Sequence, residues 1–95
     1  MIKTFELIGK TFRVIDDNKY LTDKKLLGEF RGDKCVIAMR SEAFKRQPGQ
    51  IYVHTFYHEL VHALMYSMGE GKLGRNERFV DILSGLIQQF VKTKR

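Results

Sequence analysis

The hydrophobic pattern changes its period near residue 48, and this change limits the chain to folds with strands first and helices second. Before that point, short β-branched or aromatic runs are separated by polar and turn residues. After it, apolar residues recur every three or four positions, as they do in amphipathic helices. We therefore predict an α+β fold in which a small antiparallel β-sheet is followed by two packed α-helices.

The front half contains two candidate hairpins. Residues 5–8 and 11–15 flank Gly9-Lys10, which can form a tight turn or a bulge. A polar stretch over 16–25 follows. Residues 26–30 and 35–39 then flank Arg31-Gly32-Asp33, a turn sequence that predicts a second antiparallel pair.

The back half contains two candidate helices. Pro48 can start the first and Gly69 can end it. A glycine-rich loop over 69–74 follows, and Asn76 is a suitable N-cap for the second helix. The apolar stripe of that helix is formed by Phe79, Leu83, Leu86 and Phe90, and it is widened by Val80, Ile87 and Val91.

Length and composition indicate an ordinary globular chain. Its 95 residues, 43% hydrophobic and 29% charged, suit a single domain over 1–95. No apolar run approaches the ~20 residues that cross a bilayer. The one cysteine, Cys35, cannot form an internal disulfide, and no secretory leader pattern is present, so we expect a cytoplasmic protein without a membrane partner.

The net charge of +6 permits binding to polyanions without specifying one. The basic residues are scattered along the sequence and are not interleaved with aromatic residues. Beyond this net charge, nothing in the sequence indicates a nucleic-acid partner.

The first predicted helix contains His58-Glu59-Leu60-Val61-His62, which has the pattern HExxH. Two histidines four residues apart project from one face of a helix, so both imidazoles can bind one zinc ion. Catalytic zinc has three protein ligands and one open position for water. Glu59 lies beside the histidine row, where it can act as general base on that water.

A third zinc ligand is expected from the second helix. A turn over 69–74 would bring Glu77 back toward the two histidines, and Asp81 follows it on the same helix face. Asp81 could accept the ring N–H of a zinc-bound histidine and so fix its tautomer. The segment 77–81 therefore predicts one ligand, Glu77, and one supporting carboxylate, Asp81.

HExxH on one helix and ExxxD on the next resemble the gluzincin metallopeptidases. In that family the two motif histidines and the later glutamate bind zinc, and the motif glutamate is the general base. The resemblance extends to very short, phage-encoded metallopeptidases, in which a small sheet precedes segments similar to residues 57–69 and 76–90 of this chain. It implies a zincin-like fold and hydrolysis of a peptide or protein substrate. Larger gluzincins carry a downstream helical domain whose Tyr or His stabilises the oxyanion, and this sequence has no counterpart.

Other functions and ligands remain open from the sequence. His58 and His62 could instead be partly buried helix histidines, and the metal could hold together a non-catalytic protein- or DNA-binding module.

His54 extends the histidine row, but we expect it to pack or to contact substrate. A tyrosine in the position of Tyr66 more often packs at the edge of the core than donates a hydrogen bond to an oxyanion. Cys35 is expected to be a small buried side chain in a strand. That strand, 35–39, is expected to offer an edge to an extended peptide. The oligomeric state is not predicted.

Overall fold

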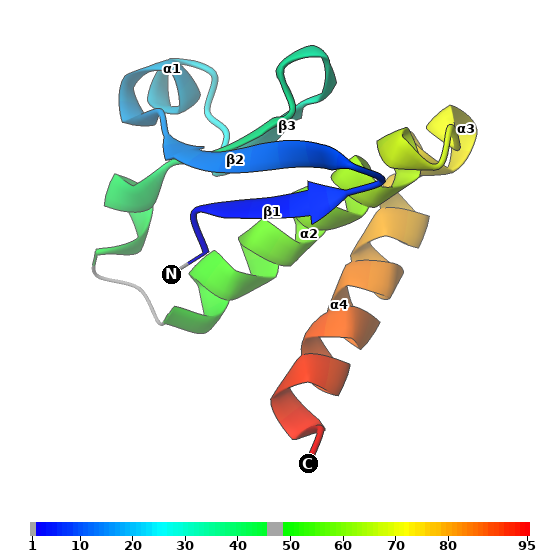
Figure 1. The fold of residues 1–95 in the computed structure, drawn as a ribbon. Helices are drawn as coiled ribbons and strands as arrows, with labels where there is room; N and C mark the ends of the chain where they lie inside the picture. Colours follow the sequence, from blue (N-terminus) through cyan, green and yellow to red (C-terminus); the bar gives the residue numbers. More distant parts are fainter. Residues whose placement is uncertain (1, 46–48) are drawn as a thin grey trace.

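A four-stranded sheet and two long helices form the core of the chain in the computed structural model, which describes residues 2–45 and 49–95 (Figure 1). The strands are β1 (Thr4–Leu7), β2 (Lys10–Asp16), β3 (Gly28–Arg31) and β4 (Val36–Met39). The long helices are α2 (Gly49–Ser67) and α4 (Glu77–Thr93). Strands come first and the long helices after them, so the predicted α+β class is confirmed.

The sheet is mixed, whereas we expected it to be wholly antiparallel. Its strand order is β1-β2-β4-β3, and β2 runs parallel to β4. The four residues of β4 are all apolar and all buried, which suits an inner strand, whereas β3 is only half buried. The chain therefore crosses to the far edge as β3 and returns as β4 beside β2. The crossover contains a short helix, α1 (Asn18–Asp23), within the polar stretch over 16–25.

Both predicted hairpins are present. β1 pairs antiparallel with β2, and the turn between them has positive φ at Ile8 and Gly9, as a two-residue hairpin turn requires. β3 pairs antiparallel with β4 through a 3₁₀ turn, η1 (Gly32–Lys34), at the predicted turn sequence. A second 3₁₀ turn, η2 (Ser41–Phe44), follows β4.

The ends of the long helices agree with the sequence signals. Gly69 adopts a φ of +74° two residues beyond the end of α2, and the Glu70 amide donates to the Met65 carbonyl at 2.8 Å, which closes a Schellman cap. The glycine-rich loop contains one helical turn, α3 (Gly71–Gly74). The Asn76 side chain caps α4 by accepting the Phe79 amide at 3.1 Å. Pro48, the predicted start of the first helix, lies outside the described residues.

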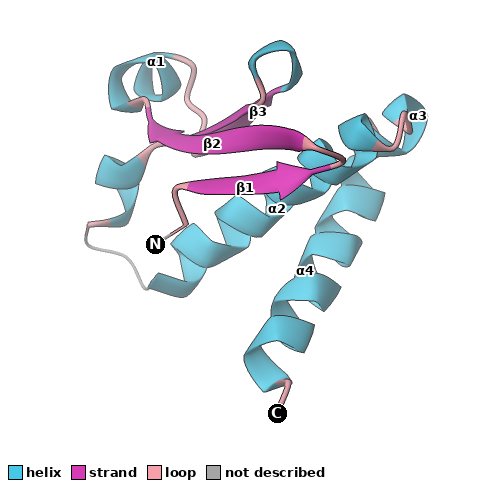
Figure 2. Ribbon diagram, viewed as in Figure 1, coloured by secondary structure: helices cyan, strands magenta, loops and turns pink. Residues whose placement is uncertain are grey.

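Helix α2 lies between the sheet and α4 (Figure 2). On the sheet side, Phe56 packs with Ile37 and Met39 of β4. On the other side, Val61 and Met65 of α2 pack with Val80 of α4. Because these clusters occupy different faces of α2, a third face is left for polar side chains.

The predicted apolar stripe of α4 is only partly buried. Val80 and Ser84 are fully buried against α2, and Phe79 and Leu83 are half-buried. Leu86 and Phe90 remain 58% and 67% exposed, respectively. The contact face of α4 is therefore rotated from the centre of its stripe toward Val80 and Ser84. Within the described residues, no helix combines the length and apolarity needed to span a membrane.

Candidate metal centre

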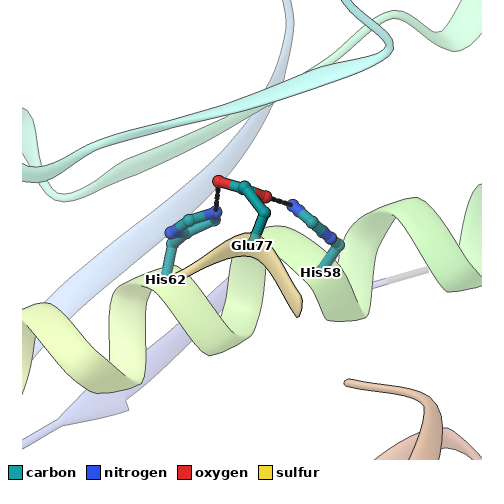
Figure 3. Close-up of side chains that lie close together, drawn as sticks. All are labelled: His58, His62 and Glu77. Atoms are coloured by element: carbon teal, nitrogen blue, oxygen red, sulfur yellow. Dashed lines mark ion pairs between the residues drawn. The ribbon is translucent and has the colours of Figure 1, made fainter. Parts of the chain in front are cut away.

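Three of the predicted site residues meet on the polar face of α2. His58 and His62 project from the middle of α2, and Glu77 reaches them from the first turn of α4 (Figure 3). The Oε2 atom of Glu77 lies 3.2 Å from Nε2 of His58, and its Oε1 atom lies 3.6 Å from Nε2 of His62. One ligand atom from each of the three residues can be chosen so that all lie within 4.8 Å of one another. The connection between α2 and α4, which contains α3, thus brings these three residues together as the sequence predicts.

The donor set of this cluster is typical of catalytic zinc, which binds imidazole nitrogens and a carboxylate oxygen. Tetrahedral zinc, with bonds of about 2.0–2.1 Å, places neighbouring donor atoms about 3.3 Å apart. The 3.2 and 3.6 Å contacts run from different oxygens of Glu77, and one donor atom from each residue can be chosen so that all lie within 4.8 Å of one another. The residues therefore fit zinc in their chemistry and lie near enough to converge on one ion.

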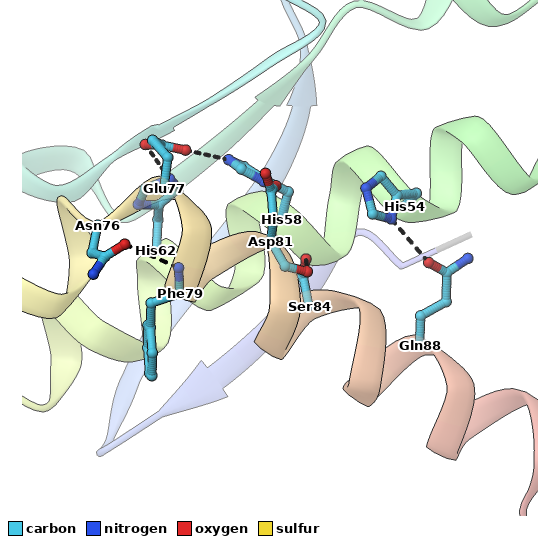
Figure 4. A network of polar contacts seen from close by, with 9 residues as sticks. All are labelled: His54, His58, His62, Asn76, Glu77, Phe79, Asp81, Ser84 and Gln88. Atoms are coloured by element: carbon cyan, nitrogen blue, oxygen red, sulfur yellow. Dashed lines mark hydrogen bonds and ion pairs between the residues drawn. The ribbon is translucent and has the colours of Figure 1, made fainter.

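Contacts with carboxylates fix the orientation of the His58 ring. Nδ1 of His58 lies 2.8 Å from Oδ1 of Asp81, and a carboxylate can only accept, so Nδ1 carries the proton (Figure 4). Nε2 of the same ring then faces Glu77. Burial lowers the pKa of His62, against the raising effects of the Glu77 charge and a backbone hydrogen bond with Gly74, which favours the neutral ring that binds a metal.

Glu59 lies beside the cluster and is the most buried of its charged groups. It is only 9% exposed, and burial raises its pKa to about 7, against the lowering effects of His58 and a backbone hydrogen bond with Phe30. The close approach of β3 causes this burial. A Cβ atom on Gly28 would lie 3.2 Å from Cγ of Glu59 and 3.1 Å from Cγ2 of Thr55, so only glycine lets the strand approach this closely.

A cavity of about 430 Å³ opens in front of the cluster. It is lined on one side by His58, Glu59, His62 and Glu77, and on the other by Leu26, Gly28, Glu29 and Phe30. The expectation that residues 35–39 offer a free edge to a peptide is wrong, because β4 lies between β2 and β3. The edge strand at the cavity is β3.

The residues of β3 at this cavity were not predicted from the sequence. Glu29 lies at its rim, where Arg31 holds it by a 2.7 Å ion pair and also bonds Asp17 at 2.8 Å. The sequence feature that could have indicated their role is Gly28 within an otherwise strand-like run. A glycine in such a place often marks a point where another segment approaches the strand backbone closely. Assigning that approach to α2 requires the strand order, which the hydrophobic pattern does not determine.

The remaining candidate residues lie away from the cluster. His54 contacts Oε1 of Gln88 at 3.2 Å through Nδ1 (Figure 4), and Tyr66 packs edge-on against Phe30. The expectation of a buried Cys35 within a strand is wrong: Cys35 precedes β4 at a φ of +52° and is only half-buried. Its sulfur lies 3.9 Å from the Gly32 carbonyl, in the turn after β3.

Comparisons of this chain with models of protein families, with curated proteins and with solved structures find no match.

Proposed function

We propose that this protein is a zinc-dependent metallopeptidase with His58, His62 and Glu77 as zinc ligands and Glu59 as general base. The observation that carries the proposal is the position of Glu77, whose two oxygens lie 3.2 and 3.6 Å from the two imidazoles, so that three zinc-type donor residues from two helices meet at one point. A buried carboxylate beside such a site is needed for hydrolysis and has no purpose in a purely structural one. The zincin-like resemblance of the sequence points to the same chemistry.

When bound, zinc lowers the pKa of a water molecule and polarises the carbonyl of the peptide bond. Glu59 accepts a proton from the attacking water and donates it to the leaving amine as the C–N bond breaks. The hydrogen bond between Glu59 and the Phe30 backbone holds the carboxylate at the cavity wall.

The free edge of β3 supports binding of an extended peptide. The Leu27 carbonyl accepts the Arg40 amide at 3.0 Å, so Leu27, Glu29 and Arg31 direct their backbone groups toward the β4 side. The backbone groups of Gly28 and Phe30 therefore point to the open side. The Phe30 amide bonds Glu59 there, which leaves the backbone groups of Gly28 and the Phe30 carbonyl for a substrate. A substrate strand that pairs there would lie across the cavity. We further propose that the protein acts in the cytoplasm, as its single cysteine suggests.

The test compares wild-type protein, Glu59→Gln and a matched control, Glu6→Gln, which removes an exposed charge from β1. Each is loaded with one equivalent of zinc and incubated with an unstructured protein substrate. Glu59→Gln should retain zinc and lose hydrolysis by ~100- to 10,000-fold, because glutamine preserves the shape but cannot accept the proton. Glu6→Gln should match the wild type.

Two outcomes would contradict the proposal. If zinc-loaded wild type shows no chelator-sensitive cleavage across a broad peptide set, the chain is a zinc-stabilised protein- or DNA-binding module instead. If Glu59→Gln cleaves as fast as wild type, Glu59 is not the base.

A further inference from the structure

The ring of His62 contacts two different elements that follow α2 in the chain. Its Nε2 atom lies 3.6 Å from Oε1 of Glu77, at the start of α4. The backbone of Gly74, the last residue of α3, forms a hydrogen bond with the same ring. Because α3 packs beside the C-terminal part of α2 (Figure 1), this contact is separate from the one that α4 makes.

The partner of the ring is the carbonyl oxygen of Gly74. Burial lowers the pKa of His62, whereas the Glu77 charge and the bond with Gly74 oppose this effect, so the bond is one in which the ring donates. A backbone carbonyl can accept from the ring, and the Gly74 amide already donates to the Glu70 carbonyl at 2.9 Å. Because Nε2 faces Glu77, the donating atom of the ring is Nδ1.

Gly74 can approach α2 this closely because it has no side chain. A Cβ atom on Gly74 would lie 3.3 Å from Cβ of Met65 and 4.0 Å from its Cγ. Met65 follows His62 by three residues, so it lies about one turn further along the same side of α2. Its Cβ atom is attached to the helix backbone and cannot swing away. A side chain at position 74 would therefore push α3 away from α2, and the carbonyl away from His62.

We propose that Gly74 is a positioning residue of the metal centre, whose carbonyl oxygen fixes the His62 ring with Nε2 free to bind zinc. This role rests on the zinc site proposed above. A metal-bound imidazole is usually oriented by a hydrogen bond from its other ring nitrogen, which also sets the tautomer. Asp81 accepts that bond from His58 at 2.8 Å. Gly74 does the same for His62, so both rings present Nε2 to one ion.

The tautomer of His62 tests the hydrogen bond directly, in the metal-free protein. NMR of the nitrogen-labelled imidazoles, at a pH where both rings are neutral, distinguishes a protonated from an unprotonated ring nitrogen. We expect a proton on Nδ1 of both His58 and His62, with both Nε2 atoms unprotonated. A His62 ring protonated at Nε2 overturns the proposal. Because the measurement needs no zinc, its result is independent of whether the chain binds zinc or hydrolyses peptides.

Gly74→Ala tests the close approach, and Gly71→Ala is the matched control in the same short helix. The Cβ atom added at Gly71 would meet only the end of the Arg75 side chain, at 3.2 Å, which can move aside. For Gly74→Ala we expect zinc affinity, measured by competition with a chromophoric chelator, to fall by roughly ten- to a hundredfold. Gly71→Ala should bind zinc as wild type does, and thermal melting checks that both variants are folded.

The effect of Gly74→Ala should be confined to one of the two rings. His62 should then populate the tautomer protonated at Nε2, whereas His58, still bonded to Asp81, should remain protonated at Nδ1. Looser packing of α3 alone would not select one histidine. The proposal is overturned if Gly74→Ala keeps wild-type zinc affinity, if it changes neither tautomer, or if Gly71→Ala has the same effect. If wild type binds no zinc, the proposed function fails, and the tautomers still decide whether Gly74 orients His62.

Discussion

Glu77 directs its two oxygens at two different histidines although its side chain is 65% exposed. A carboxylate with this freedom loses conformational entropy when it is held in one position, so its two partners must together restrain it. The histidine pair, Glu77 and Asp81 could be predicted because helical spacing alone places them on known faces. The environment of Glu59 could not be predicted, because Gly28 and Phe30, which bury it and bond to it, come from a strand distant in sequence.

Asp81→Asn should keep the fold and weaken zinc affinity by ten- to a hundredfold. The contact of 2.8 Å between Asp81 and Nδ1 of His58 fixes the ring so that Nε2 faces Glu77, and loss of such a partner typically has this effect. Competition with a chromophoric chelator measures the affinity. Glu6→Gln, which removes a charge far from the site, is the control, and equal affinities for Asp81→Asn and wild type would show that Asp81 does not orient the ligand.

Glu59 should make the metal-free protein less stable as the pH rises. Burial raises its pKa from 4.5 to about 7 in the folded state, so the folded protein holds this proton more tightly than the unfolded chain does. The Glu59 contribution to the free energy of unfolding is therefore most favourable below about pH 4.5 and is lost as the pH rises through about 7. Glu59→Gln removes this loss of stability at high pH, because glutamine does not titrate.

The measurement is urea unfolding of metal-free wild type and Glu59→Gln at pH 5 and pH 8. Between these values, the stability of the variant relative to wild type should increase by about 1 to 3 kcal/mol. Comparing the two proteins cancels the opposite trend from His62, whose pKa is lowered by burial. A difference independent of pH would mean that the Glu59 carboxylate is solvated.

At the scale of elements, the sequence predicts the long helices better than the sheet. The helix ends are marked by local residues, such as Gly69 and Asn76, whose effect does not depend on distant parts of the chain. The order of the strands depends instead on pairings between residues that are far apart in the chain. β4, whose four residues are all buried, lies inside the sheet beside β2, and β3 forms the edge that faces α2.

The contact between β3 and α2 should be sensitive to a single methyl group. In Gly28→Ala, the added Cβ would lie 3.1 Å from Thr55, 3.2 Å from Glu59 and 3.3 Å from the sulfur of Met39. We expect a loss of about 1–3 kcal/mol in the free energy of unfolding, as for other overpacked sites. Gly85→Ala is the matched control: its Cβ meets nothing within 4 Å in the middle of α4, so it should stabilise the protein by roughly 0.5–1 kcal/mol. Urea unfolding of both variants checks this, and equal effects of the two would contradict the close approach.

At the scale of the whole molecule, the charge at the candidate metal centre is opposite in sign to the net charge of the chain. The chain has a net charge of +6, yet Glu29, Glu59 and Glu77 line the cavity at the candidate metal centre, with Asp81 next to it. A cleft of negative charge attracts cations and repels phosphates. Any DNA binding should therefore involve the scattered surface lysines and arginines and fade steeply with salt.

In the proposed site, one zinc ion joins α2 to α4 through His58, His62 and Glu77. Zinc K-edge X-ray absorption of the protein with one equivalent of zinc tests this directly. We expect about four nitrogen or oxygen ligands at about 2.0–2.1 Å, with the scattering signature of two imidazoles and no sulfur. His62→Ala should lose one imidazole from the spectrum. A sulfur ligand at about 2.3 Å, which only Cys35 or a methionine could supply, or a zinc spectrum without imidazole, would contradict this ligand set.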